Sequence, residues 1–137
     1  MITGGCLCKA VRYAVDVDAP LAVRTCWCRL CQYLGGGTAT VNVCFPADKV
    51  TLTGDLSYHG AVADSGNEMR RGFCPACGTP VTSEALARPH LMFFRAGTLD
   101  DPSIAAPEAT IWTSEKPAWG LVSDAIPSYP AQIPPVA

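Results

Sequence analysis

Short runs of apolar and β-branched residues recur along the chain and predict strands. Val11, Tyr13 and Val15 alternate with polar or small residues, which is the period of a half-buried strand. The run His90–Ala96 is apolar enough for a buried strand. Further strand-forming segments are residues 21–25, 38–45, 50–53, 56–58, 68–73 and 110–113. Gly54-Asp55 predicts a hairpin turn between segments 50–53 and 56–58.

Helical signal is weak, because only residues 29–34 and 83–87 favour a helical turn or two. Gly and Pro number 12 each, and most of the prolines follow residue 100, where they disfavour helix. The pattern therefore predicts an all-β (mainly β) fold. We expect one domain over residues 1–125 and a proline-rich extended tail over residues 126–137.

Charge and hydropathy exclude several classes of protein. Lys and Arg number 10 against 12 Asp and Glu, a net charge of −2, so the basic surface usual in nucleic-acid binding is missing. No run approaches the roughly 18 apolar residues of a membrane helix. The start, Met1 to Cys6, lacks the basic and apolar regions of a secretory signal, so we expect a cytoplasmic protein. In that reducing compartment, cysteines bind metal or do chemistry more often than they form disulfides.

Seven of the 8 cysteines form three short clusters with the spacing of metal ligands. The clusters are Cys6-Leu7-Cys8, Cys26-Trp27-Cys28-Arg29-Leu30-Cys31 and Cys74-Pro75-Ala76-Cys77. Structural zinc takes four tetrahedral ligands, with sulfur at about 2.3 Å. Gly78, directly after the third cluster, suits the left-handed turn that such loops use. No cluster holds four sulfurs, so a closed site has to combine two of them.

The preferred combination joins the first and third clusters in one closed four-sulfur site. The middle cluster then has three sulfurs and an open fourth position, where chemistry can occur. Spacing alone does not force this pairing, because Cys26 or Cys31 could instead join Cys74 and Cys77. A redox dithiol, a disulfide framework, or a single zinc with three spare thiols also stay open.

The eighth cysteine, Cys44, lies in a strand pattern on the face opposite Val41, Val43 and Phe45. We interpret it as a buried strand residue that behaves as a small apolar side chain. The alternative is that Cys44 closes the three-sulfur site as a fourth ligand.

The three clusters and their flanks resemble the motifs of the glutathione-dependent formaldehyde-activating enzyme (Gfa) family, also called the centromere-protein-V/Gfa domain family. The matching segments are Gly4-Gly5-Cys6-Leu7-Cys8-Lys9-Ala10-Val11-Arg12-Tyr13, the Cys26–Cys31 motif and Phe73-Cys74-Pro75-Ala76-Cys77-Gly78-Thr79-Pro80. Segments 96–102 and 111–119 are also similar to the family, so the resemblance covers most of the chain. The sequence departs from the family at Trp27, where His is common, and at Lys9, where Gly is common.

The resemblance implies a fold of several small coiled antiparallel sheets, shared with a zinc-binding Rab-accessory chaperone family. It implies two zinc ions per chain: a structural zinc on Cys6, Cys8, Cys74 and Cys77, and a second zinc, linked to activity, on Cys26, Cys28 and Cys31. The implied reaction is that of a carbon–sulfur lyase, in which formaldehyde and glutathione combine to S-hydroxymethylglutathione. A thiol in the open position of a three-thiolate zinc site would lose its proton and stay nucleophilic towards a small aldehyde.

Other candidate groups are less specific. His59 and His90 are the only histidines, and we interpret both as surface or hydrogen-bonded residues rather than acid–base catalysts. Arg70 or Arg71 could hold a glutathione carboxylate, or both could lie on a solvated strand face.

The remaining expectations concern the core and the rivals to an enzyme. The run Met92, Phe93 and Phe94 is expected in the core. No motif identifies the residues that bind glutathione, and the oligomeric state stays open. The rival functions are a non-enzymatic zinc-binding module and a protein that buffers thiol or zinc.

Overall fold

The chain is described here by a computed structural model of residues 1–137. It is mainly β, as the sequence pattern predicts. The main elements are β1 (Ile2–Gly5), β2 (Arg12–Val15), β3 (Ala22–Cys26), α1 (Arg29–Leu34), β4 (Thr40–Pro46), β5 (Val50–Thr53), β6 (Ser57–Val62), β7 (Glu68–Phe73), β8 (Pro80–Ala85), β9 (Leu91–Arg95) and β10 (Ala109–Ile111). Single 3₁₀ turns are η1 (Ala47–Lys49), η2 (Ala96–Thr98), η3 (Pro102–Ile104) and η4 (Thr113–Glu115).

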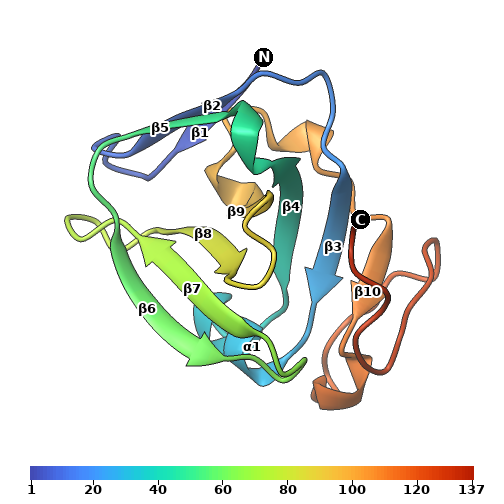
Figure 1. The fold of residues 1–137 in the computed structure, drawn as a ribbon. Coiled ribbons are helices and arrows are strands. Elements are labelled where there is room, and N and C mark those ends of the chain that lie inside the picture. Colours follow the sequence, from blue (N-terminus) through green and yellow to red (C-terminus); the bar gives the residue numbers. More distant parts are fainter.

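The strands form two sheets. The small sheet has the order β1-β2-β5 and the large one the order β10-β3-β4-β9-β8-β7-β6. All neighbours are antiparallel except β10 and β3, which are parallel. The large sheet is strongly bent, so that β6, β7 and β8 run obliquely to β3 and β4 (Figure 1). The bend gives the sheet a concave face, on which the candidate site lies.

The hydrophobic core lies between the small sheet and the opposite face of the large one. Val43 and Phe45 of β4 and Phe94 of β9 are fully buried there. Tyr13 of β2 stacks on Phe94 with ring centroids 3.9 Å apart, so the small sheet covers this face directly. Because side chains alternate along a strand, the residues between these point to the concave face.

Two local predictions are wrong. The segments around Gly54-Asp55 do not form a hairpin, since β5 pairs with β2 in the small sheet and β6 with β7 in the large one. Gly54 has a φ of 88°, and a Cβ there would collide with the carbonyl of Ala10. This turn therefore packs closely against the small sheet, and after it the chain crosses to the large sheet. Residues 83–87 are not helical, because Ser83–Ala85 belong to β8, which pairs with β7 and β9. Tertiary pairing overrides a weak helical preference.

The short helix over residues 29–34 is confirmed as α1. The Cys28 sulfur caps its first turn by accepting a hydrogen bond from the Cys31 N–H at 3.3 Å. Gly35 ends it, with its N–H bonded to the Cys31 carbonyl. Neither helix end relies on a charged side chain of its own turn.

The proline-rich C-terminal segment runs beside β10. The Tyr129 N–H donates to the Thr110 carbonyl at 2.8 Å, and the Thr110 N–H donates to the Pro127 carbonyl at 3.0 Å. Further on, Val136 packs against the buried cluster that contains Ala22. None of the helices has the length and apolar character that a membrane crossing requires.

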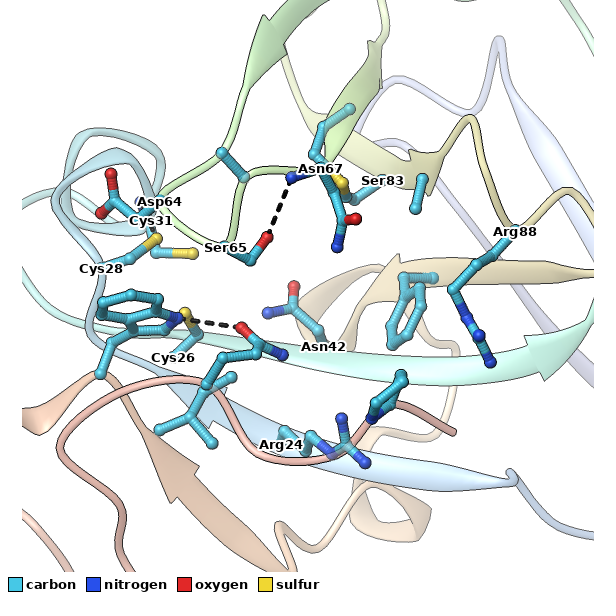
Figure 2. A pocket seen from close by; sticks show the side chains of 18 of the residues that line it. Arg24, Cys26, Cys28, Cys31, Asn42, Asp64, Ser65, Asn67, Ser83 and Arg88 are labelled. Atoms are coloured by element: carbon cyan, nitrogen blue, oxygen red, sulfur yellow. Dashed lines mark hydrogen bonds between the residues drawn. The ribbon is translucent and has the colours of Figure 1, made fainter. Parts of the chain in front are cut away.

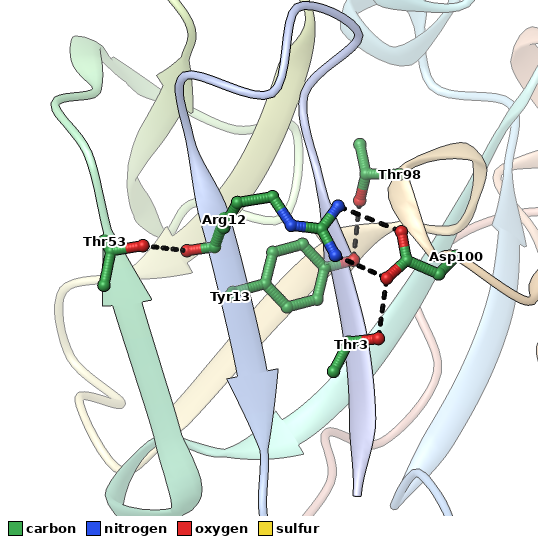
Figure 3. Close-up of polar contacts among 6 residues, drawn as sticks. All are labelled: Thr3, Arg12, Tyr13, Thr53, Thr98 and Asp100. Carbon is green, nitrogen blue, oxygen red and sulfur yellow. Dashed lines mark hydrogen bonds and ion pairs between the residues drawn. The ribbon is translucent and has the colours of Figure 1, made fainter.

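One ion pair ties the small sheet to the chain after β9 (Figure 3). The Arg12 guanidinium donates two hydrogen bonds to the Asp100 carboxylate, at 3.0 and 2.5 Å, and Thr3 donates a third at 2.6 Å. Arg12, followed by Thr3, lowers the pKa of Asp100 to about 2. Beneath the pair, the hydroxyls of Tyr13 and Thr98 are 2.8 Å apart.

We expect Asp100→Asn to lower the midpoint of thermal unfolding at pH 7, because the variant loses the charge that Arg12 binds. The pair is partly exposed, so the difference from wild type should shrink as sodium chloride is added. Thr53→Ala is the matched control, since it removes only a long 3.4 Å bond to the Arg12 carbonyl. Equal destabilisation by both substitutions would contradict this role for the ion pair.

Candidate metal centres

Four cysteine sulfurs converge where the loop after β1 meets the loop after β7. The sulfurs of Cys6, Cys8, Cys74 and Cys77 all lie within 4.8 Å of one another. Cys8 lies 3.6 Å from Cys6 and 3.7 Å from Cys74, sulfur to sulfur. A tetrahedron of sulfurs around zinc, with bonds of about 2.3 Å, has edges of about 3.8 Å. The four sulfurs therefore fit a closed zinc site, and they are the set that the preferred pairing joins.

Backbone turns hold both loops in the shape that brings the sulfurs together. The Lys9 N–H donates to the Cys6 carbonyl at 3.1 Å, and Lys9 has a φ of 67°. Glycine adopts this conformation more readily than a residue with a side chain, so the turn holds Lys9 in a backbone shape that is uncommon for lysine. In the second loop the Gly78 N–H donates to the Cys74 carbonyl at 2.8 Å, with a φ of 77° at Gly78. The turn expected at Gly78 is thus present.

Nearby donors stabilise negative charge on these sulfurs. The Val11 N–H donates to the Cys6 sulfur at 3.3 Å. The Thr79 hydroxyl lies 3.1 Å from the Cys77 sulfur, and its hydrogen bond lowers the pKa of that thiol to about 5. A thiol that ionises readily is a ready ligand for a divalent cation.

The second cluster contains Cys26, Cys28 and Cys31, whose sulfurs also lie within 4.8 Å of one another. Cys26 ends β3, and the backbone N–H of its neighbour Trp27 donates to the Ile111 carbonyl of β10 at 3.0 Å. Cys28 caps α1 and Cys31 lies in its first turn, so a strand end and a helix start converge on one point. Three thiols in a half-buried site fit a cation with one further position for another ligand.

These three thiols share charge unequally. Hydrogen bonds from Cys26, then Cys28, lower the pKa of Cys31 to about 3. The neighbouring Cys28 and Cys31 sulfurs raise the pKa of Cys26 far above the ordinary value. The cluster alone therefore favours one thiolate, and a divalent cation supplies the charge that would ionise all three.

The three sulfurs open onto a cavity of about 150 Å³ on the concave face of the large sheet (Figure 2). Side chains from β3, β4, β7, β8, β9 and β10 line it, together with the loop between β6 and β7 and the C-terminal segment. Figure 2 shows the sulfurs at one end, beside Asp64, with Asn42 near the middle. Its charged lining groups are Arg24, Arg71, Arg88, Arg95 and Asp64.

The structure separates the two neighbouring arginines of β7. Arg70 is exposed, pairs with Glu84 at 2.9 Å and lies over the Tyr58 ring at 4.1 Å. Arg71 points the other way, is buried and lines the cavity. His59 and His90 are exposed, and neither lines the cavity.

The expectations for the apolar residues are met in part. Phe94 is core and Met92 packs against it, but Phe93 lines the cavity, because alternation along β9 turns it to the concave face. Cys44 is fully buried and belongs to neither sulfur cluster. Trp27 is also buried and lies outside the cavity lining. Its ring packs so closely against Gly120 that a Cβ there would collide with it, so the ring fills space away from the cavity.

Sequence reasoning missed most of the cavity. Arg24, Asn42 and Arg95 come from three strands, and Asp64 from a loop that has no motif. One of these residues could have been found from the sequence: side chains alternate along a strand, so Arg24 lies on the same face as Cys26. Strand order, which places Arg95 near them, is not visible in the sequence.

Fold and site define a class: a mainly β protein with one four-cysteine and one three-cysteine cluster, both able to hold a metal ion. The family described as "Glutathione-dependent formaldehyde-activating enzyme" matches residues 1–115, and the chain belongs to this family. A curated relative from Halomonas elongata, named "Putative glutathione-dependent formaldehyde-activating enzyme", is 26% identical over 124 residues, covering 87% of this chain and 79% of the relative.

The fold is also similar to the crystal structure of a Rhodobacter sphaeroides protein. That comparison has a TM-score of 0.58 at 16% identity and covers 92% of this chain and 98% of the other. At this identity the likeness concerns the fold alone.

We expect two zinc ions per chain, and loss of one ligand in the three-cysteine cluster should remove only the zinc of that cluster. Cys28→Ser should retain about one zinc and the fold. Cys74→Ser should unfold the chain, because a structural zinc contributes about 10 kcal/mol and a domain is stable by only about 5–15 kcal/mol. Elemental analysis and circular dichroism measure both outcomes.

Cys44→Ala is the matched control, since it removes a buried sulfur outside both clusters. It should keep two zinc ions. An unchanged zinc content in Cys28→Ser would contradict the assignment of the second site.

Proposed function

We propose that the chain is a zinc-dependent carbon–sulfur lyase of the Gfa type, acting on a thiol–aldehyde adduct such as S-hydroxymethylglutathione. The supporting observation is the contrast between the two clusters. One has four sulfurs and is complete, whereas the other has three sulfurs at the end of a cavity. In zinc proteins a complete ligand set is structural and an incomplete one is catalytic.

In this proposal Cys26, Cys28 and Cys31 hold the second zinc, and Cys6, Cys8, Cys74 and Cys77 hold a structural zinc. When bound, the second zinc would lower the pKa of a substrate thiol and keep it as a thiolate. Three cysteine thiolates donate much negative charge to the metal, which suits a soft sulfur substrate better than activation of water.

The reaction itself is a reversible addition. The substrate thiolate sulfur bonds to the formaldehyde carbon, the C=O electron pair moves to oxygen, and that oxygen takes up a proton. In the reverse direction the hydroxyl oxygen loses its proton, the C=O bond reforms and the C–S bond breaks. Asp64 is the one carboxylate in the cavity lining, so we assign the proton transfer to it.

The surrounding residues favour ionised sulfur and position it. Arg71 and Arg95 are buried beside the three cysteines; burial lowers the pKa of each guanidinium, and the negative charge of the cysteines offsets part of that lowering. Gln32 fixes the loop of the cluster by donating to the Trp27 carbonyl at 2.8 Å and to the Glu115 carbonyl at 3.0 Å.

The proposed partners are a small thiol such as glutathione and a small aldehyde such as formaldehyde. All 8 cysteines are free thiols in the structure. A reducing compartment such as the cytoplasm would keep both clusters available for metal, and we place the protein there.

Exchange spectroscopy on a mixture of formaldehyde and glutathione should show faster interconversion with S-hydroxymethylglutathione when the protein is added. Cys28→Ser should return the rate to that without protein, because the three-sulfur cluster has lost a ligand. His59→Gln is the control and should behave as wild type, since His59 is exposed and outside the cavity. If wild type leaves the uncatalysed rate unchanged, a non-enzymatic zinc module or a zinc-buffering role replaces the enzyme.

A further inference from the structure

Four arginines line the cavity that the three sulfurs open into. They are Arg24 on β3, Arg71 on β7, Arg88 between β8 and β9, and Arg95 at the end of β9. Two of them face one asparagine across neighbouring strands, because Asn42 is paired with Arg24 on one side and Arg95 on the other. Like charges gathered on one sheet face are unfavourable unless something balances them.

The protein itself provides little that balances these charges. Asn42 accepts a hydrogen bond from Arg95 but carries no charge, and Arg24 makes only a long 3.4 Å bond to the Pro134 carbonyl. Neither ion pair of the structure involves any of the four. Arg71 and Arg95 are only 9% and 8% exposed, and every one of the four has a buried guanidinium nitrogen without a protein partner.

The metal-loaded cluster would not neutralise them either. Three thiolates around one divalent zinc carry a net charge of −1, and Asp64 adds one further negative charge. Two of the four positive charges then stay unbalanced. Buried charges in proteins are normally paired, so the cavity is built for an anion that comes from outside the chain.

The arginines divide into two pairs along the cavity. Arg71 and Arg95 lie in the field of Cys31 and its neighbours. Arg24 and Arg88 point towards the other end of the cavity (Figure 2). There burial raises the pKa of Cys44, and the charges of Arg24 and Arg88 oppose that rise. The end of the cavity remote from the reacting sulfur is therefore the one with unbalanced positive charge.

We propose that this cavity selects thiols that carry carboxylate groups, with Arg24 and Arg88 as the carboxylate-binding residues and the three cysteines at the sulfur end. Guanidinium groups bind carboxylates with two parallel hydrogen bonds, which fixes orientation as well as charge. This inference rests on the proposed function for the role of the sulfur end. It adds the two residues that would favour carboxylate-bearing thiols over small neutral ones.

Calorimetry with S-methylglutathione tests this without any reaction, because the blocked sulfur cannot become a thiolate while both carboxylates remain. Zinc-loaded wild type should bind it, and should bind its diethyl ester at least about tenfold more weakly, since hydrogen bonds to charged groups contribute about 1.5–3 kcal/mol. Arg24→Gln and Arg88→Gln should weaken binding of the acid by a similar factor and leave binding of the ester unchanged.

Arg70→Gln is the matched control, because Arg70 lies on the outer face and pairs with Glu84. It should bind the acid as wild type does. Arg88→Lys, which keeps the charge, should restore part of the affinity lost in Arg88→Gln. Zinc content and the melting temperature show whether each variant is folded.

Equal binding of acid and ester by wild type, or unchanged binding of the acid in both glutamine variants, would overturn the inference. These outcomes are separate from those of the lyase assay. Arginine-dependent binding without faster exchange would support the carboxylate site and refute the lyase. Faster exchange with equal binding of acid and ester would support the lyase and refute the carboxylate site.

Discussion

The constraint that links the two sheets is the convergence of four sulfurs from Cys6, Cys8, Cys74 and Cys77. Cys6 and Cys8 follow β1 of the small sheet, and Cys74 and Cys77 follow β7 of the large one. A metal ion on this cluster would join two loops that are far apart in sequence, one from each sheet. Such a cross-link chiefly reduces the conformational freedom of the unfolded chain. The same cross-link would also hold the end of β7, and with it the bend of the large sheet, on the core side.

The same strands build the core and the cavity, because their side chains alternate. Along β9 the core receives Phe94, while Phe93 and Arg95 line the cavity on the other face. Along β4 the core receives Val43, and Asn42 lines the cavity. A shift of register by one residue would therefore place guanidinium groups in the core. The apolar packing that stabilises the fold thus also fixes which charged groups meet the sulfurs.

What could be predicted from sequence was mostly local. The cysteine spacing, the turn at Gly78 and the short helix at residues 29–34 depend on neighbours in the chain. Most strands were visible in the alternation of side chains, but β1 and β8 were not predicted. The hairpin at Gly54 failed because β5 and β6 belong to different sheets, and no local pattern encodes that choice. Arg24 and Arg95 escaped notice for the same reason, since only the strand order brings them to Asn42.

The two ends of the cavity carry opposite charges. Without a metal, hydrogen bonds from Cys26, then Cys28, favour a single thiolate at Cys31, and Arg71 and Arg95 lie in its field. A divalent cation would ionise the other two thiols, and the three thiolates with the cation would carry the same net charge of −1 beside these arginines. Arg24 and Arg88 would then remain as the positive end, which gives the cavity a direction. A substrate with sulfur at one end and carboxylate at the other matches that direction, because its sulfur would meet the metal and its carboxylate would meet the two arginines.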